Sequence, residues 1–260
     1  MRRPEFAFVQ ARLQARLGDF QRTVRWPSIE ASRGVAQFLA ALRATALGRW
    51  VEGFDESVDA HRVEAALREK WAAYVVEVAR WQPPPWRAAT RWFGLLPELP
   101  RIDALRRAGA LRPAPDASTQ GATIPFALTS PLQEPPLNES MAVNRSELGS
   151  FGAKHATAGD GATATIWVAE FRRRVPRDAG DLDTIRPARW LLPTLGGDRT
   201  GRGRASGRAA AALVRHLHRL AGSPPAVFAF LALVALDVER LRGGLLVRQL
   251  LPRTPQGEDA

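Results

Sequence analysis

Apolar residues recur every three or four positions along most of this chain, and this spacing constrains its fold more than any other feature. Such a spacing places apolar side chains along one face of an α-helix. The first stripes run from Phe6 to Val24, from Val35 to about Trp50, and from Val63 to Trp81. More stripes follow towards the end of the sequence, so we predict an all-α fold.

Prolines separate the predicted helices of the first half. Proline lacks the amide hydrogen that a helix interior needs, so Pro27 ends the first helix and Pro83–Pro85 end the third. Shorter helices are expected over residues 86–96 and 97–111. Short connections between amphipathic helices indicate antiparallel neighbours, and residues 1–111 are therefore predicted to form an N-terminal helical block.

The helical pattern stops in the middle of the sequence. Residues 112–161 are rich in Pro, Ser, Thr and Gly, a composition typical of a linker or long loop. Helical stripes return over residues 162–260, which are predicted to form a C-terminal helical block. The expected architecture is a helical bundle of two antiparallel blocks joined by a Pro/Ser/Thr-rich loop, and the sequence leaves open whether that loop is ordered.

Small and polar residues mark the expected turns and caps. Gly53 with Asp55 is expected to supply a turn and a cap before the third helix, and Ser223 is expected to cap the last helix. Residues 196–207, GGDRTGRGRASG, are expected to form a glycine–arginine loop. That loop could hold phosphate groups, but it lacks the GxGxxG spacing and a preceding strand, so a solvated loop is the simpler interpretation.

The chain lacks the residue patterns on which most catalytic and metal sites depend. It contains no cysteine, which excludes disulfides, thiolate metal sites and cysteine nucleophiles. His216 and His218 lie two positions apart on a predicted helix and so point to different faces. No zinc-binding spacing or hydrolase elbow is present. We therefore predict no catalytic residue, no metal and no cofactor, and expect a non-enzyme that docks to partners.

The longest apolar segment predicts a buried helix. Residues Pro225 to Val238 are fewer than the about 20 residues that a membrane-spanning helix needs. The N-terminal arginines are not followed by the apolar core of a signal peptide. We expect a cytoplasmic chain with no direct membrane span, at most peripheral on the cytoplasmic face of a membrane.

Charged residues inside the apolar stripes are the most informative polar positions. Glu64 lies within the apolar sequence VEAAL, and four charged residues follow the apolar run of the last helix: Asp237, Glu239, Arg240 and Arg242. Charges at half-buried positions are tolerated when they are paired. We therefore predict ion pairs between helices, with a structural role first.

Three segments resemble the C/d subunit family of rotary V-type and A-type ATPases. FAFVQARLQARL at residues 6–17 is similar to the first helix of that family, with an aromatic start and an arginine pair, Arg12 and Arg16, four positions apart. LAALRAT followed by VEAAL resembles a leucine–threonine helix end and the valine–glutamate helix after it. The last helix resembles the family's final helix, with glutamate and arginine on an apolar background. Family members are usually longer and carry another helical unit where this chain has residues 112–161.

The resemblance implies both a fold and a function. Members of the family are all-α funnels that receive the tip of the rotor shaft and rest on the membrane proteolipid ring. The chain would then be a non-catalytic subunit that links shaft and ring, with other subunits of a membrane-associated complex as its partners. By the same resemblance, Arg12 and Arg16 would line the first helix, while Glu64, Glu239 and Arg242 would tie helices together.

Two other functions remain open from the sequence. The net charge is +11, so an arginine-rich helical protein that binds nucleic acid or another anionic partner is the main alternative. Against it, the arginines are spread over every helix, and a GC-rich genome would produce the same excess of arginine. The second alternative is an enzyme with an unfamiliar helical site. Its first sign would be a carboxylate or histidine with a strongly shifted pKa in a deep pocket.

Overall fold

The computed structural model describes residues 6–107, 162–177, 181–196 and 199–250. Every element in these residues is a helix and none is a strand, which confirms the all-α prediction. The first half contains α1 (Ala7–Thr23), α2 (Trp26–Glu30), α3 (Val35–Arg43), α4 (Gly48–Val51), α5 (Ala60–Trp81), α6 (Pro84–Phe93), the 3-10 helix η2 (Leu96–Glu98) and α7 (Leu99–Arg107). The second half contains α9 (Ala162–Arg174), α10 (Asp181–Gly196), α11 (Arg199–Arg219) and α12 (Pro225–Leu250). The predicted linker at 112–161 lies outside the described residues.

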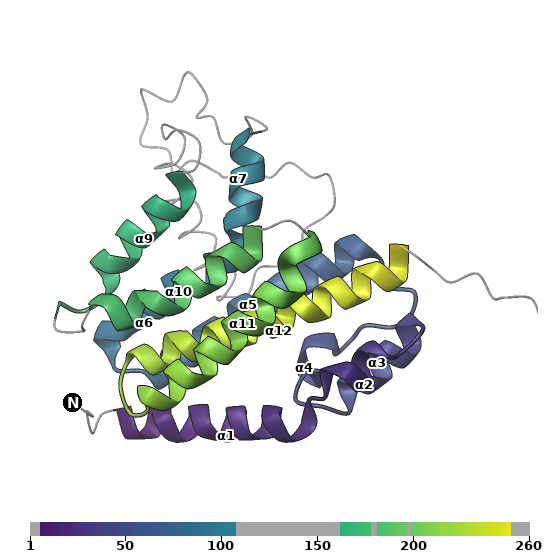
Figure 1. Cartoon of the computed structure of the whole chain (residues 1–260), viewed down its shortest axis with the longest axis horizontal. Coiled ribbons are helices and arrows are strands. Elements are labelled where there is room, and N and C mark those ends of the chain that lie inside the picture. Colours follow the sequence, from purple (N-terminus) through teal and green to yellow (C-terminus); the bar gives the residue numbers. More distant parts are fainter. Residues whose placement is uncertain (1–5, 108–161, 178–180, 197–198, 251–260) are drawn as a thin grey trace, which may run out of the picture.

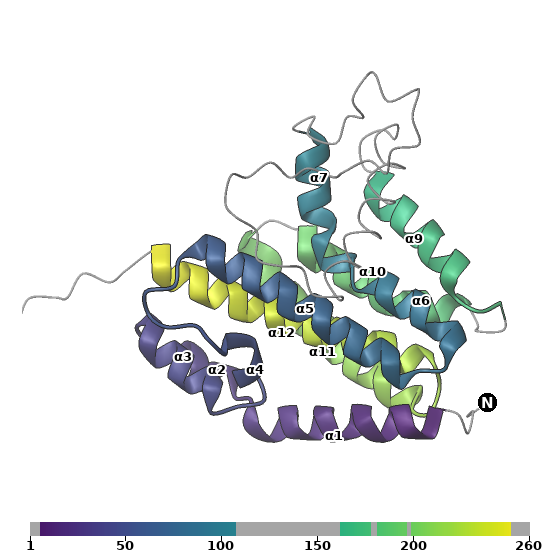
Figure 2. The ribbon, with the colours of Figure 1, turned by 180° about the vertical axis from the view of Figure 1, so that it is seen from behind.

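Helix α12 is the central element of the molecule. It packs against α10 and α11 from its own half of the chain, and against α1, α3, α5 and α6 from the other half. Figures 1 and 2 show α5, α11 and α12 running side by side, with α1 along one side and α7 and α9 projecting on the other. The helices of the two predicted blocks therefore contribute to one hydrophobic core.

The apolar start of α12 is buried on all sides, as the sequence predicts. Every residue from Pro225 to Ala232 is buried. In the part of the chain that the structure describes, no helix combines the length and the hydropathy that crossing a membrane requires. A helix that is apolar all round is stable in water only when neighbouring helices cover it, and the contacts of α12 supply that cover.

Aromatic side chains join the two halves at the start of α12. The ring of Phe228 lies 5.3 Å from that of Phe93 on α6 and 5.1 Å from that of Phe171 on α9. Trp86 lies 6.2 Å from Phe228 on another side. These centroid distances are typical of favourable aromatic pairs. All four rings are almost completely buried.

The prediction of one helix from Val35 to about Trp50 is wrong, because this segment forms two helices, α3 and α4. The hydroxyl of Thr45 donates to the carbonyl of Leu42 at 2.7 Å and accepts from the amide of Leu47 at 3.1 Å, which ends α3. The chain then turns so tightly that a Cβ on Gly48 would lie 2.9 Å from the carbonyl oxygen of Arg43. A side chain at position 48 would clash with this turn.

Three turn and cap predictions also need correction. Gly53 does form a turn with φ of +79°, but the N-cap of α5 is Asp59, whose carboxylate accepts from the amide of Arg62 at 2.9 Å. Ser223 donates its hydroxyl to the carbonyl of Leu220 at 2.5 Å rather than capping α12. The predicted glycine–arginine loop is helical from Arg199 onwards, because the packing of α11 on α10 and α12 outweighs the low helix propensity of glycine.

A close helix approach occurs near the end of α12. A Cβ built on Gly244 would lie 2.5 Å from Cζ of Phe38, a ring that is fully buried on α3. One turn further along α12, the guanidinium of Arg248 lies over the same ring, 4.1 Å from its centroid. Position 244 therefore has no room for a side chain while phenylalanine occupies position 38.

Candidate functional site

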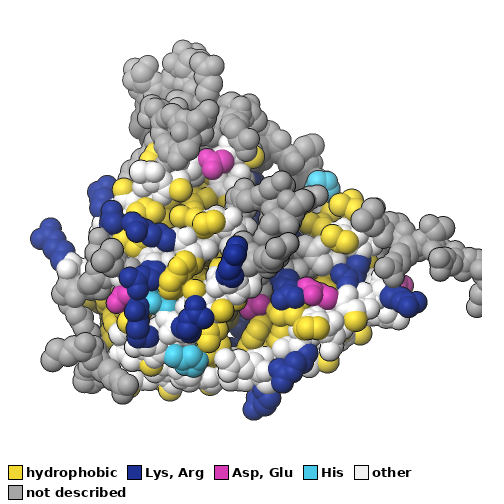
Figure 3. Space-filling view, viewed as in Figure 1, with side chains coloured by type: hydrophobic (Ala, Val, Ile, Leu, Met, Phe, Trp, Pro, Cys, Tyr) yellow, Lys and Arg dark blue, Asp and Glu magenta, His cyan; other side chains and the backbone are white. Residues whose placement is uncertain are grey.

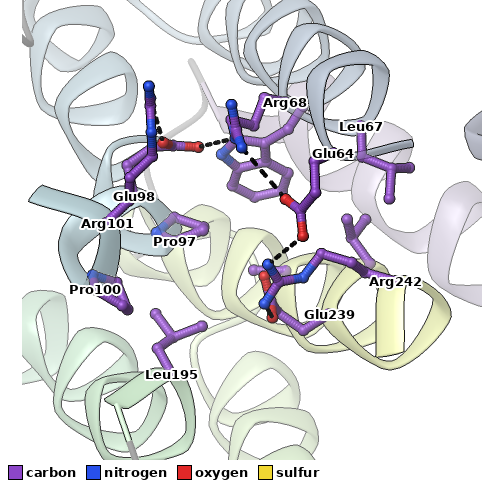
Figure 4. Close-up of a pocket in the computed structure, with 13 residues that line it drawn as sticks. Glu64, Leu67, Arg68, Pro97, Glu98, Pro100, Arg101, Leu195, Glu239 and Arg242 are labelled. Carbon is purple, nitrogen blue, oxygen red and sulfur yellow. Dashed lines mark hydrogen bonds and ion pairs between the residues drawn. The ribbon is translucent and has the colours of Figure 1, made fainter. Parts of the chain in front are cut away.

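Five helical segments line a cavity of about 360 Å³ that we call the charged pocket (Figure 4). The pocket holds three glutamates and three arginines within an apolar wall. Its lining comprises Glu64, Leu67, Arg68 and Trp71 of α5; Pro97 and Glu98 of η2; Pro100 and Arg101 of α7; Leu195 of α10; and Ala235, Val238, Glu239 and Arg242 of α12. The intervals within α5 and α12 are those of one helix face, so helical periodicity alone brings each set together.

The most tightly paired charge in the charged pocket is Arg242. Its guanidinium donates to Glu64 across the α5–α12 interface at 2.8 Å and to Glu239 on its own helix at 2.6 Å. Burial disfavours the charged guanidinium, but Glu239 and Glu64 outweigh that effect and raise the pKa of Arg242. The predicted inter-helix ion pair is confirmed at Glu64 and Arg242.

A looser group of charges occupies the opposite wall. Glu98 is buried, with Arg68 at 3.9 Å and Arg101 at 3.6 Å from its carboxylate. Arg68 also lies 3.5 Å from Glu64, which links the two groups. Figure 4 shows these side chains facing one another around the cavity. With three charges of each sign, the charged pocket is balanced, and its residues serve mainly to neutralise one another.

The sequence pattern missed half of this cluster. Arg68 follows Glu64 by four positions, a spacing that already favours an ion pair on a helix. Glu98 lies between two prolines in PELPR, directly after an apolar segment. An acid at such a position is the sequence signal that could have indicated a charged residue in the pocket. Arg101 then follows by three positions, but its place in the charged pocket depends on the turn from η2 into α7.

The first-helix arginines lie away from the charged pocket. The guanidinium of Arg12 stacks over the rings of Phe8 and Trp81, at 4.8 and 5.3 Å. Arg16 pairs with Glu77 of α5 at 3.2 Å. Both arginines therefore lie along α1, and Arg16 ties that helix to α5.

Asp237 and Arg240 lie on the side of α12 that faces α2. Asp237 does not form the predicted ion pair with an arginine, since its carboxylate accepts the indole hydrogen of Trp26 at 3.0 Å. Arg240 forms a bidentate pair with Glu30, at 2.6 and 2.7 Å, and stacks over Trp26 at 4.6 Å. Burial raises the pKa of Asp237 to about 7, although the Trp26 hydrogen bond and Arg240 act to lower it. This shifted carboxylate does not line the charged pocket.

Replacing Asp237 by asparagine is expected to stabilise the protein at pH 8 and not at pH 4.5. The unfolded chain releases this proton near pH 3.9 and the folded chain near pH 7, so stability falls as the pH rises between those values. Asp237→Asn keeps an oxygen for Trp26 and removes the charge. We expect a gain of about 1–2 kcal/mol at pH 8, measured by urea unfolding.

A matched control is Asp55→Asn. Hydrogen bonds from Ser57, at an exposed turn, hold the pKa of Asp55 below its usual value, so this variant should not gain stability at pH 8. If Asp237→Asn is less stable than the parent at pH 8, the contacts of the ionised carboxylate stabilise the fold by more than its burial destabilises it.

The histidines offer no metal site within the described residues. No group of three His, Asp or Glu side chains in that part of the chain is placed to hold a metal ion. His216 is buried between α10 and α11, with its ring nitrogens 2.9 Å from the carbonyl of Asp183 and 2.9 Å from Arg219, whereas His218 is exposed. Their different faces confirm the sequence prediction. Burial lowers the pKa of His216, so the ring is neutral in the fold at pH 7.

Comparison of the chain with models of known families, with curated proteins and with solved structures gave no match.

Proposed function

We propose that this chain is a non-catalytic subunit of a rotary V-type or A-type ATPase that links the rotor shaft to the membrane proteolipid ring. The proposal begins from the sequence resemblance, which involves three segments. Those segments form α1, the end of α3 with the start of α5, and the second half of α12. They are distant in sequence but belong to helices that α12 contacts directly.

Ion pairs between helices support the proposal most strongly. A subunit that transmits torque must keep its helices from sliding, and ion pairs between helices oppose such sliding. Glu64–Arg242 joins α5 to α12, Arg16–Glu77 joins α1 to α5, and Arg240–Glu30 joins α2 to α12. The residues that carry the resemblance take part in each of these pairs.

The charged pocket is also consistent with a non-catalytic role. Its three acids and three bases are paired with one another, whereas a catalytic carboxylate would be aimed at open space in the cavity. Among the described residues, Asp237 is the carboxylate whose pKa is most strongly raised, and it accepts a hydrogen bond from Trp26. Catalysis by the complex would then lie in other subunits.

Co-purification from native membranes tests the proposal. The affinity-tagged chain is expressed in the cells that encode it, the membranes are solubilised in mild detergent, and the captured subunits are identified by mass spectrometry. We expect proteolipid and shaft subunits in stoichiometric amounts. The control bait is the same tag on an unrelated helical protein of equal net charge.

Purification of the rotary ATPase through one of its other subunits gives the result that could contradict the proposal. If an intact rotary ATPase purified through its catalytic subunit contains shaft and ring but not this chain, the proposal fails. Recovery of the chain in that preparation, with loss of shaft–ring coupling in a deletion strain, would support it.

A further inference from the structure

The outer sides of α10 and α11 carry a concentration of arginine that lies outside the segments that resemble the ATPase subunit. We call this surface the basic face and define it by Arg186, Arg189, Arg208, Arg215, His218 and Arg219. Over their full length the two helices contain eight arginines against two aspartates, and α11 contains no acid at all. Figure 3 shows Lys and Arg side chains gathered over these helices.

Helical geometry explains how the basic face forms. Arg208, Arg215 and Arg219 are separated by seven and four positions, so they lie along one stripe of α11. The opposite stripe of α11 is buried against α10 and α12 through Ala209, Leu213 and Leu217. The sequence pattern thus separates an apolar side from a basic side along one helix.

Little negative charge offsets this surface in the described residues. Asp183 pairs with Arg219 at 2.9 Å and with Arg186 at 3.3 Å, and it joins α10 to α11. Arg189, Arg208 and Arg215 are exposed and pair with no carboxylate in the part of the chain that the structure describes. Among the described residues, these three guanidinium groups are therefore exposed without a carboxylate partner.

We propose that the basic face binds the anionic phospholipid headgroups of a membrane surface. Guanidinium groups match phosphate geometry, and each arginine close to an anionic bilayer strengthens binding by about fivefold. This proposal rests on the proposed function, which places the chain beside a membrane. It adds a contact with lipid headgroups to the contact with the proteolipid ring.

The form of the surface favours headgroups over nucleic acid. Helix α11 packs against both α10 and α12 along its apolar side, so the basic face is a broad surface of two helices rather than one projecting recognition helix. The large aromatic side chains of α9, Trp167 and Phe171, are buried, and Trp190 of α10 packs against His216 at 5.2 Å. Among the described residues, the basic face therefore has no fully exposed Trp, Phe or Tyr ring on which bases could stack, and its one exposed ring is the imidazole of His218. Headgroups need only charge and hydrogen-bond donors.

Vesicle co-sedimentation of the full chain tests the proposal. Vesicles of phosphatidylcholine are compared with vesicles that also contain about 30% phosphatidylglycerol, at low and at high salt. We expect binding only to the anionic vesicles, and loss of binding at high salt because exposed charges are screened.

Two triple variants with the same loss of charge locate the binding surface. Arg189→Gln/Arg208→Gln/Arg215→Gln changes the basic face, whereas Arg33→Gln/Arg62→Gln/Arg80→Gln changes exposed arginines of the first half. The basic-face variant should bind anionic vesicles about 100-fold more weakly, and the control variant only a fewfold more weakly. Circular dichroism and thermal unfolding show that both variants are folded.

Three results would overturn the proposal. The first is that both triple variants weaken binding to anionic vesicles equally, and the second is that the chain binds neutral vesicles. The third is that the chain binds duplex or single-stranded nucleic acid more tightly than anionic vesicles, and that the basic-face variant abolishes this binding. Pure vesicles contain no ring subunit, so the two proposals fail separately. Loss of vesicle binding with intact co-purification rejects the lipid contact alone, and the reverse result rejects the proposed function alone.

Discussion

Phe228→Ala is expected to lower the free energy of unfolding by about 3–5 kcal/mol, the usual cost of emptying a phenylalanine site in a packed core. The ring is fully buried, and it contacts Phe93 of α6 and Phe171 of α9 from its place on α12. Removing it therefore opens a void where three helices from both halves of the chain meet. Urea unfolding followed by far-UV circular dichroism measures the change.

The shape of that transition is as informative as its midpoint. Because Phe228 joins both halves, we expect one cooperative transition that moves as a whole. Two transitions, of which only one shifts, would show that the halves unfold independently as separate blocks. Phe8→Ala is the control, since 57% of that side chain is exposed and its removal should change stability by about 0.5 kcal/mol or less.

Arg242→Met is expected to lower the free energy of unfolding by about 2–4 kcal/mol. Removing one partner of a half-buried ion pair costs more than the pair itself contributes, because the remaining charge keeps its desolvation penalty. Here two carboxylates, Glu64 and Glu239, would face each other across the charged pocket without the cation between them. Methionine keeps most of the side-chain volume, so the loss reports on charge rather than on packing.

An exposed pair and a double-mutant cycle separate this effect from a general loss of charge. Arg16→Met breaks the Arg16–Glu77 pair, in which the arginine side chain is 46% exposed, and should cost less than about 1 kcal/mol. Adding Glu64→Gln to Arg242→Met should restore part of the lost stability, because it removes one of the unbalanced acids. If Arg242→Met costs no more than Arg16→Met, the charged pocket does not hold α5 and α12 together.

Local periodicity predicted the helices well where one face of each helix is buried. In α1, the buried residues Val9, Leu13 and Leu17 are members of the stripe seen in the sequence. The same rule failed between α3 and α4, where Thr45 diverts the backbone hydrogen bonds and the apolar pattern continues through the break. The prediction of a loop at the start of α11 failed for another reason: the low helix propensity of glycine is a weak signal compared with packing.

The candidate site shows a similar division between local and distant information. An acid within an apolar stripe pointed to Glu64, and an arginine after an apolar run pointed to Arg242, but nothing in the sequence paired them across 178 positions. Asp237 shows the limit more clearly. The sequence predicts a nearby arginine as its partner, whereas the fold brings Trp26 to it from 211 positions away.

The contact between Gly244 and Phe38 links the sequence choices at two distant positions. Since a Cβ on residue 244 would overlap the ring, a chain with this fold can carry alanine or serine there only if residue 38 is smaller. The two positions should therefore vary together among descendants of a common ancestor, glycine with phenylalanine and a larger residue with a smaller one. Such paired substitutions would identify distant kin of this protein after the rest of the sequence has diverged.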